Sequence, residues 1–250
     1  MVAIKTEKLP SLSIVFPAYN EEKNITISID RAQFYAKRRN IDYEIIVVDD
    51  GSRDATAKMV SDEIKADERV KLIRHKKNQG YGATVCDGLN AASKDFVFFT
   101  DSDLQFDINE LDQFIKKIEG YDAVIGYRNP RRDPLMRLVN AWGWKYLIAL
   151  VFGVKVGDLD CAFKLFRRDV LKKIKVKSRG AMFSAELIIR LIINKNKISQ
   201  LPVNHYKRVA GNPTGAKLSV IFRAFKELFA IRAELNGELA QIERCDRIIS

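Results

Sequence analysis

The chain has 250 residues, of which 47% are hydrophobic and 30% charged, with three cysteines, two histidines and a formal net charge of +11. This composition predicts a globular domain with a sizeable core, and it excludes a disulfide framework or a zinc site because the cysteines are few and widely spaced. The first residues carry Lys5, Glu7 and Lys8 instead of an apolar run, so no secretory signal and a cytoplasmic location are expected.

The charge is divided unevenly along the chain. Residues 1–125 hold 18 Lys/Arg and 22 Asp/Glu, whereas residues 126–250 hold 25 and 10, so the two halves carry formal charges of −4 and +15. A basic half favours phosphorylated substrates, an anionic membrane face or nucleic acid, although a solvated basic surface gives the same pattern. Nucleic acid is not expected, because no zinc-finger, RNP or helix-turn-helix signature is present.

Short apolar runs alternate with stretches of helical periodicity through the first half. Strands are predicted at 12–16, 44–48, 70–73 and 96–100, with helices at 24–38 and 55–64 and a third that ends at residue 89. Strands and helices that alternate at this spacing form right-handed βαβ units, so we expect a mostly parallel sheet with ligands at the carboxyl ends of its strands. Polar clusters fall at those ends, at 17–22, 49–52, 78–82 and 101–105.

The pattern changes after a fifth predicted strand, which ends in Gly126-Tyr127-Arg128. An apolar helix at 135–152 is interrupted by charged and amide side chains, which makes it a poor membrane span. It suits either a helix in a membrane interface or one of a pair of core helices. The later elements are a short strand at 165–166, a helix that opens at 183, an edge strand with a proline at 201–204, and a helix at 217–235 with an apolar face on which Leu228 and Phe229 are placed together.

The apolar run at 96–99 ends in two carboxylates and an amide. Asp101, Asp103 and Gln105 alternate in sequence, so in an extended backbone their side chains project to one side. Hard oxygen ligands suit Mg²⁺ or Mn²⁺, which complete their coordination with water and substrate phosphates. The stretch therefore predicts a metal–diphosphate site, with solvated aspartates at the start of the next helix as the alternative.

Five motifs, in this order, carry a resemblance to a known enzyme family. They are Pro17-Ala-Tyr-Asn-Glu21, Asp49-Asp-Gly-Ser52, Asp101-Ser-Asp-Leu-Gln105, Gly126-Tyr-Arg128 and Asp160-Cys-Ala-Phe-Lys164. The set resembles the inverting family-2 glycosyltransferases, and among them the polyprenyl-phosphate glycosyltransferases and dolichyl-phosphate mannose synthases. The resemblance covers about residues 12–230. It implies an α/β fold of the GT-A nucleotide-diphospho-sugar transferase type, with a mostly parallel central sheet and helices on both faces.

The resemblance also implies roles for individual residues. Those implied to bind the nucleotide are Pro17, Ala18, Tyr19, Glu21, Asp49, Asp50 and Ser102, and among them Asp50, with Asp49 beside it, is implied to read the base. The residues implied to be catalytic bind the metal or neutralise phosphates, and they are Asp101, Asp103, Arg128 and Arg208. The cofactor, Mg²⁺ or Mn²⁺, is implied to bind Asp101, Asp103 and Gln105.

The implied reaction is metal-dependent, inverting transfer of a hexose from a nucleotide sugar to polyprenyl or dolichyl phosphate. The two candidate donors are GDP-mannose and UDP-glucose. A phosphate-monoester acceptor has a second pKa of about 6, so it is a dianion at neutral pH and needs no strong general base. The greater difficulty is the departing diphosphate, which a divalent ion and guanidinium groups stabilise electrostatically.

Two departures from the family pattern leave the sugar, the base and the lipid open. Phe106-Asp107 stands where His-Pro-Pro is common, and Gly211-Asn-Pro-Thr-Gly215 replaces the familiar Gly-x-Ser-Lys, a lysine for which Lys217 would substitute. A glycosyltransferase with another acceptor, or a nucleotide-sugar binder without turnover, fits the same motifs. A receiver-like signalling domain would be much shorter, and a dehydrogenase would carry a GxGxxG motif after its first strand.

We expect one catalytic domain at 1–230, with a nucleotide-sugar-binding half at 11–125 and an acceptor-side half at 126–216, and an amphipathic helical segment at 217–250. No apolar run is long enough to span a membrane, although the implied acceptor is a lipid. Peripheral attachment to the cytoplasmic membrane face is therefore expected, through Trp142, Trp144, Tyr146 and the helix from Lys217 to Leu235, or through a membrane-spanning partner. The alternative is that both regions are ordinary core.

Overall fold

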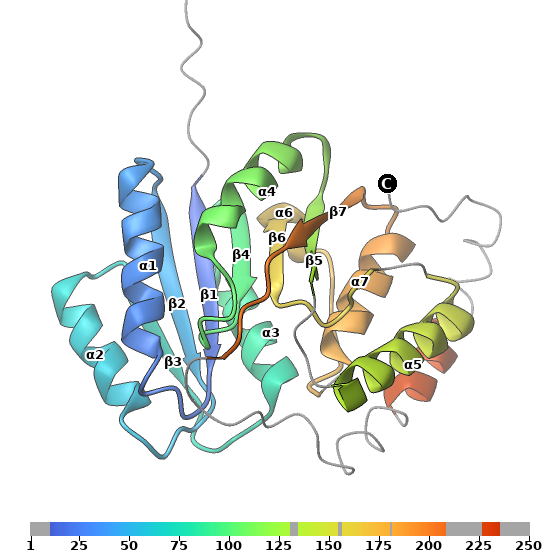
Figure 1. Ribbon diagram of the computed structural model, residues 1–250, viewed down its shortest axis with the longest axis horizontal. Coiled ribbons are helices and arrows are strands. Elements are labelled where there is room, and N and C mark those ends of the chain that lie inside the picture. The colour runs from blue at the N-terminus through green and yellow to red at the C-terminus, as the bar shows by residue number, and fades with distance from the viewer. Residues whose placement is uncertain (1–10, 131–134, 155–156, 181, 209–226, 236–250) are drawn as a thin grey trace, which may run out of the picture.

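The computed structural model describes residues 11–130, 135–154, 157–180, 182–208 and 227–235. A seven-stranded sheet forms its centre, in the order β3-β2-β1-β4-β6-β5-β7 (Figure 1). The strands are β1 (Leu12–Ala18), β2 (Tyr43–Asp49), β3 (Val70–Arg74), β4 (Phe96–Thr100), β5 (Ala123–Arg128), β6 (Phe163–Arg167) and β7 (Ile198–Val203). The predicted strands of both halves are present, and β7, with its proline, lies at an edge of the sheet as expected.

The sheet is mostly parallel, as predicted. β1 pairs in parallel with β2 and β4, β2 with β3, and β5 with β7. The exception is β6, which runs antiparallel between β4 and β5. This reversal places the segment before β6 beside the carboxyl end of β4, because the register pairs Thr100 with Phe163.

Helices cover both faces of the sheet. They are α1 (Ile25–Arg38), α2 (Thr56–Ala66), α3 (Tyr81–Ala91), α4 (Leu111–Lys117), α5 (Leu135–Phe152), α6 (Arg168–Leu171) and α7 (Phe183–Ile193), and 3-10 turns at Ile108–Glu110 and Ile118–Gly120 flank α4. Successive residues of β1 face opposite layers, since Ile14 and Phe16 pack with α1 and α4, whereas Val15 packs with α3 and α7. Burial on both faces explains why these strands are apolar runs without alternation.

The helix at 227–235 joins the core formed with α5 and α7, which was the alternative expectation for this region. Leu228, Ile231 and Leu235 are buried in the same cluster as Ile148 of α5. Phe229 is 62% exposed, so the expectation that it shares one apolar face with Leu228 is wrong, because neighbours in a helix point about 100° apart. Residues 217–226 and 236–250 of the predicted segment lie outside the described residues.

α5 forms over the residues predicted for it. Ile148 and Phe152 are buried, whereas Tyr146 and Leu150 are 56% and 84% exposed. The side chain of Trp142 lies outside the described part of the chain. Among the helices that are described, none has both the length and the hydropathy to cross a bilayer.

Candidate active site

The polar clusters predicted at strand ends lie at one edge of the sheet. The parallel register pairs Ala18, the last residue of β1, with Asp49, the last residue of β2. It also pairs Val15 with Phe99, so β4 ends at the same edge. The loops that follow these three strands therefore meet in space, as a parallel sheet dictates.

Ser102 links the loop that follows β4 to the end of β1. Its hydroxyl donates to the carbonyl oxygen of Pro17 at 3.0 Å, and the hydroxyl of Ser28 on α1 donates to the Ser102 carbonyl at 3.0 Å. Both bonds are buried. Ser102 was predicted to bind nucleotide, and its side chain here positions the backbone of the predicted nucleotide loop.

Asp101 and Asp103 follow β4 directly, but the backbone between them is not extended as the sequence argument assumed. Residues 102–104 form a bend, and Leu104 has a φ of 62°. Desolvation and then the negative charge of Asp103 raise the pKa of Asp101, and burial raises the pKa of Asp103. Two carboxylates that resist ionisation on their own fit a divalent cation, which would compensate both charges.

Gln105 is turned toward the segment after β7. Its Nε2 donates to the carbonyl oxygen of Tyr206 at 3.0 Å, and the Tyr206 amide donates to the Gln105 carbonyl at 2.9 Å. Its role as a third metal ligand stays a prediction. In the described residues no group of three His, Cys, Asp or Glu side chains could hold a metal alone, so substrate or water oxygens would complete the coordination.

Arg208 reaches the loops that follow β1 and β4. Its Nη2 donates to Oε1 of Glu21 at 2.6 Å and lies 3.4 Å from Oδ2 of Asp103. Its Nε is buried and has no hydrogen-bond partner among the described residues. Glu21 is fixed by Asn24, whose Nδ2 donates to Oε2 at 2.7 Å. The structure thus brings three predicted site residues together and places a guanidinium group, the kind of group that pairs with phosphates, between the loops that follow β1 and β4.

Arg128 has a different environment from Arg208. Its Nε and Nη2 donate to Oδ2 and Oδ1 of Asp158 at 2.6 and 2.9 Å, and both residues are buried. This pair joins the end of β5 to the loop before β6. The guanidinium fork is engaged by a carboxylate, so a contact with phosphates stays a prediction for Arg128.

Asp49 and Asp50 differ in how their carboxylates are used. Asp50 accepts hydrogen bonds from the amides of Gln79 and Gly80 at 2.8 and 2.9 Å, and its Oδ1 lies 2.7 Å from Nδ1 of His75. Asp49 accepts from the Ser52 amide through Oδ1, while its buried Oδ2 has no hydrogen-bond partner in the described residues and lies 3.2 Å from Nε of Arg74. Of the four carboxylate oxygens of Asp49 and Asp50, Oδ2 of Asp49 is therefore the one without a hydrogen bond in the described residues.

Several charged or polar residues near this edge have no role predicted from the sequence. Lys164 of β6 is fully buried, and its Nζ donates to the carbonyls of Leu159 and Cys161 in the loop before its own strand. Tyr81 donates from its hydroxyl to Oδ1 of Asp101 at 3.0 Å. Tyr81 belongs to the polar cluster predicted at 78–82, so its position near the site was indicated by the sequence. Nothing in the sequence indicates the contacts of Lys164.

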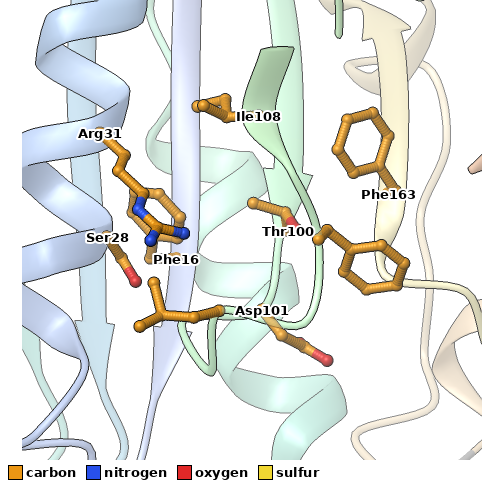
Figure 2. A pocket seen from close by; sticks show the side chains of 9 residues that line it. Phe16, Ser28, Arg31, Thr100, Asp101, Ile108 and Phe163 are labelled. Carbon is orange, nitrogen blue, oxygen red and sulfur yellow. The ribbon is translucent and has the colours of Figure 1, made fainter. Parts of the chain in front are cut away.

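A small pocket lies beside Asp101 on the side of α1 (Figure 2). Thr100, Phe163 and Arg31 are among its lining residues, and the hydroxyl of Thr100 is buried without a hydrogen-bond partner in the described residues. The pocket offers about 20 Å³, which is room for about one water molecule. The pocket is therefore too small to hold a nucleotide or a sugar.

Residues 13–175 match the family model for glycosyl transferase family 2. The chain belongs to this family. The match covers every strand of the sheet except β7 and includes the loops that carry the three meeting clusters. The expected resemblance is thereby confirmed.

Curated relatives of this glycosyl transferase family 2 chain are similar over most of its length. A dodecaprenyl-phosphate galacturonate synthase of Rhizobium johnstonii is 28% identical over 227 residues, which is 88% of this chain and 66% of that protein. An undecaprenyl-phosphate 4-deoxy-4-formamido-L-arabinose transferase of Proteus mirabilis is 32% identical over 167 residues, 66% of this chain and 51% of that protein. The chain thus spans between half and two thirds of the length of these relatives.

Solved structures confirm the fold. The mannosyltransferase PcManGT from Pyrobaculum calidifontis, in complex with GDP-Man and Mn²⁺, matches with a TM-score of 0.64 at 18% identity and covers 94% of this chain and 69% of that one. Glucosyl-3-phosphoglycerate synthase from Mycobacterium tuberculosis, with Mn²⁺, UDP and glucosyl-3-phosphoglycerate, matches with a TM-score of 0.60 at 20% identity and covers 94% and 80%. The chain has the GT-A fold that the motifs implied.

Proposed function

We propose that this protein transfers a hexose, with inversion, from a nucleotide sugar to the phosphate of a polyprenyl or dolichyl carrier. The observation that carries the proposal is the junction at which Arg208 contacts Glu21 and Asp103, next to Asp101. A guanidinium group beside metal-binding carboxylates suits a sugar diphosphate. The two curated relatives, which by name act on dodecaprenyl and undecaprenyl phosphate, support a polyprenyl phosphate as the acceptor class.

Asp101 and Asp103, with Gln105, would hold Mg²⁺ or Mn²⁺. When bound there, the ion supplies electrostatic stabilisation of the diphosphate. Both neighbouring structures named above contain Mn²⁺, which supports the choice of metal. The raised pKa values of the two carboxyl groups fit this role, since a site without a compensating cation disfavours two adjacent negative charges.

For the nucleotide, we assign contact with the base to Asp49. Both oxygens of Asp50 already accept hydrogen bonds from the loop at 79–80, whereas Oδ2 of Asp49 has no such bond and only an ion pair with Arg74, an exposed side chain that would have to move aside for a base to reach this buried oxygen. The neighbouring structures hold GDP-Man in one case and UDP in the other, so GDP and UDP are both candidates for this chain. The hexose would be mannose if the nucleotide is GDP and glucose if it is UDP.

In the reaction, an oxygen of the acceptor phosphate forms a bond to the anomeric carbon while the bond from that carbon to the diphosphate breaks. The acceptor is a dianion at neutral pH, so the chain does not have to remove a proton from it. Arg208 contributes positive charge near the diphosphate as negative charge accumulates on the leaving group. Attack opposite the leaving group inverts the anomeric centre.

The acceptor also requires that the protein meet a membrane. We propose that the exposed side of α5, with Tyr146 and Leu150, contributes to reversible attachment at an anionic, cytoplasmic membrane face, where each nearby basic residue adds about 1 kcal/mol. Sedimentation with anionic vesicles should then decrease as salt is raised, and Leu150→Ala should weaken it without loss of fold. If the protein does not sediment with vesicles at low salt, a membrane-spanning partner has to deliver the lipid.

The direct experiment is incubation of the purified chain with undecaprenyl phosphate, Mn²⁺ and either UDP-glucose or GDP-mannose. We expect a glycosylated lipid phosphate by mass spectrometry, with release of one nucleoside diphosphate for each sugar transferred and loss of both products in EDTA. Binding of nucleotide without transfer to any lipid phosphate would overturn the assignment and leave a nucleotide-sugar binder.

A further inference from the structure

Tyr81 is the first residue of α3, and its hydroxyl donates to Oδ1 of Asp101 at 3.0 Å. Its side chain is 42% exposed, so it contributes little to the hydrophobic core. A tyrosine that is only partly buried and points its hydroxyl at a metal-binding carboxylate is therefore better placed to act on that carboxylate than to stabilise the fold.

The loop that presents Tyr81 is held in place from two sides. On one side, the amides of Gln79 and Gly80 donate to the carboxylate of Asp50. On the other side, the backbone at 179–180 packs so closely that a Cβ added at Gly82 would lie 2.5 Å from the carbonyl oxygen of Gly180. Gly80 has a φ of 101°, a backbone conformation that residues other than glycine rarely adopt. The position of Tyr81 is thus determined by its surroundings on both sides.

A row of polar and charged side chains connects these two sides. His75 is buried, with Nδ1 at 2.7 Å from Asp50 and Nε2 at 3.0 Å from Oδ2 of Asp87 on α3. Arg179 donates to both oxygens of Asp87 at 3.1 and 3.2 Å, and to the side-chain oxygen of Gln79 at 3.3 Å. The row Asp50, His75, Asp87 and Arg179, named here the loop clamp, therefore links the end of β2 to the segment before α7 through α3.

We propose that Tyr81 is a positioning residue for Asp101 and that the loop clamp holds Tyr81 in place for this role. The inference rests on the proposed function, because it assumes that Asp101 binds the metal. The Tyr81 hydroxyl donates to Oδ1, so Oδ2 would be the oxygen that binds the cation. Mg²⁺ demands near-ideal octahedral geometry, and loss of a group that orients a metal ligand costs typically about 10–100-fold in metal affinity or activity.

The first test is Tyr81→Phe, which removes one oxygen atom and keeps the ring. We measure the affinity for Mn²⁺, alone and with UDP or GDP, by titration calorimetry, together with kcat and KM for the donor and the melting temperature. The expected result is Mn²⁺ affinity and kcat about tenfold lower, with an unchanged melting temperature. Tyr43→Phe is the matched control, because the Tyr43 hydroxyl donates to Asp67 at a similar distance, 2.9 Å, away from the site. It should leave Mn²⁺ affinity and kcat unchanged.

The second test asks whether the loop clamp acts through Tyr81. Asp87→Asn weakens its contacts with His75 and Arg179 and should lower Mn²⁺ affinity in the wild-type background. In the Tyr81→Phe background the same change should cost nothing further, because residues that act through one contact are not additive. Full additivity of the two losses would overturn the role of the loop clamp.

The outcomes separate this inference from the proposed function. If the wild-type chain binds Mn²⁺ with UDP or with GDP and Tyr81→Phe binds it equally well, the inference is wrong while the proposed function stands. If the wild-type chain binds no Mn²⁺ with either nucleotide, the metal site itself is wrong, and both ideas are overturned.

Discussion

Arg208 donates from Nη2 to Oε1 of Glu21 at 2.6 Å, across 187 positions of sequence. The same nitrogen lies 3.4 Å from Asp103. Glu21 and Asp103 belong to the half of the chain with a formal charge of −4, and Arg208 belongs to the half with +15. The fold therefore brings acidic residues of the first half and a basic residue of the second half into contact, at the carboxyl ends of β1 and β4.

Arg208→Lys should lower kcat/KM about tenfold, and Arg208→Ala about 100-fold. Lysine keeps the charge but loses the planar fork, while alanine removes both the phosphate contact and the partner of Glu21. These fold-changes correspond to a loss of about 1.5–3 kcal/mol, which is the free energy that a hydrogen bond with a charged group contributes. Steady-state kinetics with varied donor concentration provide the measurement.

Arg69→Lys is the control for Arg208, because Arg69 pairs with Asp67 just before β3 begins. The pair therefore lies at the amino end of that strand, whereas the site lies at the carboxyl ends of the parallel strands. It should leave kcat/KM unchanged. If Arg208→Ala has full activity, the guanidinium only compensates the charge of Glu21 and takes no part in transfer.

Asp103→Asn should abolish metal-dependent transfer and at the same time stabilise the metal-free fold. Burial raises the pKa of Asp103, so the folded state disfavours its ionised form, and above that pKa the charge lowers the free energy of unfolding. A neutral amide removes this cost. We therefore expect the metal-free variant to melt at a higher temperature than the metal-free wild type.

Differential scanning fluorimetry with and without Mn²⁺ and UDP tests both parts of the Asp103 prediction. The ligand-induced shift of wild type should be absent in Asp103→Asn. Asp107→Asn is the matched control, since Asp107 only caps the turn at 108–110 and asparagine caps equally well. Turnover of Asp103→Asn at the wild-type rate would refute the assignment of Asp103 as a metal ligand.

The fold could be predicted from sequence because β1, β2 and β4 are buried on both faces and end in polar clusters. Parallel topology alone then brings those clusters to one edge. The side-chain pairing could not be predicted: Asp158 engages Arg128, and Tyr81 contacts Asp101, through segments that only the folded chain brings together. The assumption of an extended backbone at 101–105 was wrong because Leu104 adopts a positive φ, which periodicity does not reveal.

Asp49→Asn and Asp50→Asn should have different effects. We expect Asp49→Asn to weaken binding of UDP or GDP by about 1–3 kcal/mol, because a base donor loses its charged acceptor. Asp50→Asn should instead lower the free energy of unfolding by about 1–3 kcal/mol, because the amides of Gln79 and Gly80 lose a charged acceptor. Isothermal titration with each nucleotide and urea denaturation separate the two effects. A nucleotide-binding loss confined to Asp50→Asn would restore the original sequence-based role of that residue.

Glu44 makes the fold sensitive to acid at a position remote from the site. Its buried carboxylate accepts hydrogen bonds from the Lys71 ammonium at 2.6 Å, the Ser13 hydroxyl at 2.6 Å, and the amide and hydroxyl of Ser93 at 2.6 and 2.8 Å. Burial alone would raise the pKa of Glu44, but these hydrogen bonds outweigh it and lower the pKa from 4.5 to about 2. The ionised form is therefore more stable in the folded chain than in the unfolded chain.

A pKa lower in the folded state contributes stability that is fully present above pH 4.5 and is lost as the pH falls toward 2. The difference corresponds to about 3 kcal/mol. We expect Glu44→Gln to lower the free energy of unfolding by about this amount at pH 7, and the gap between wild type and variant to narrow below pH 4.5. Urea denaturation at pH 7, 5, 4 and 3 measures the gap.

Asp62→Asn is the control, because Asp62 and its partner Lys65 are both exposed, and it should leave the free energy of unfolding nearly unchanged at every pH. A gap that stays constant from pH 7 to pH 3 would mean that the hydrogen bonds around Glu44 do not depend on its charge.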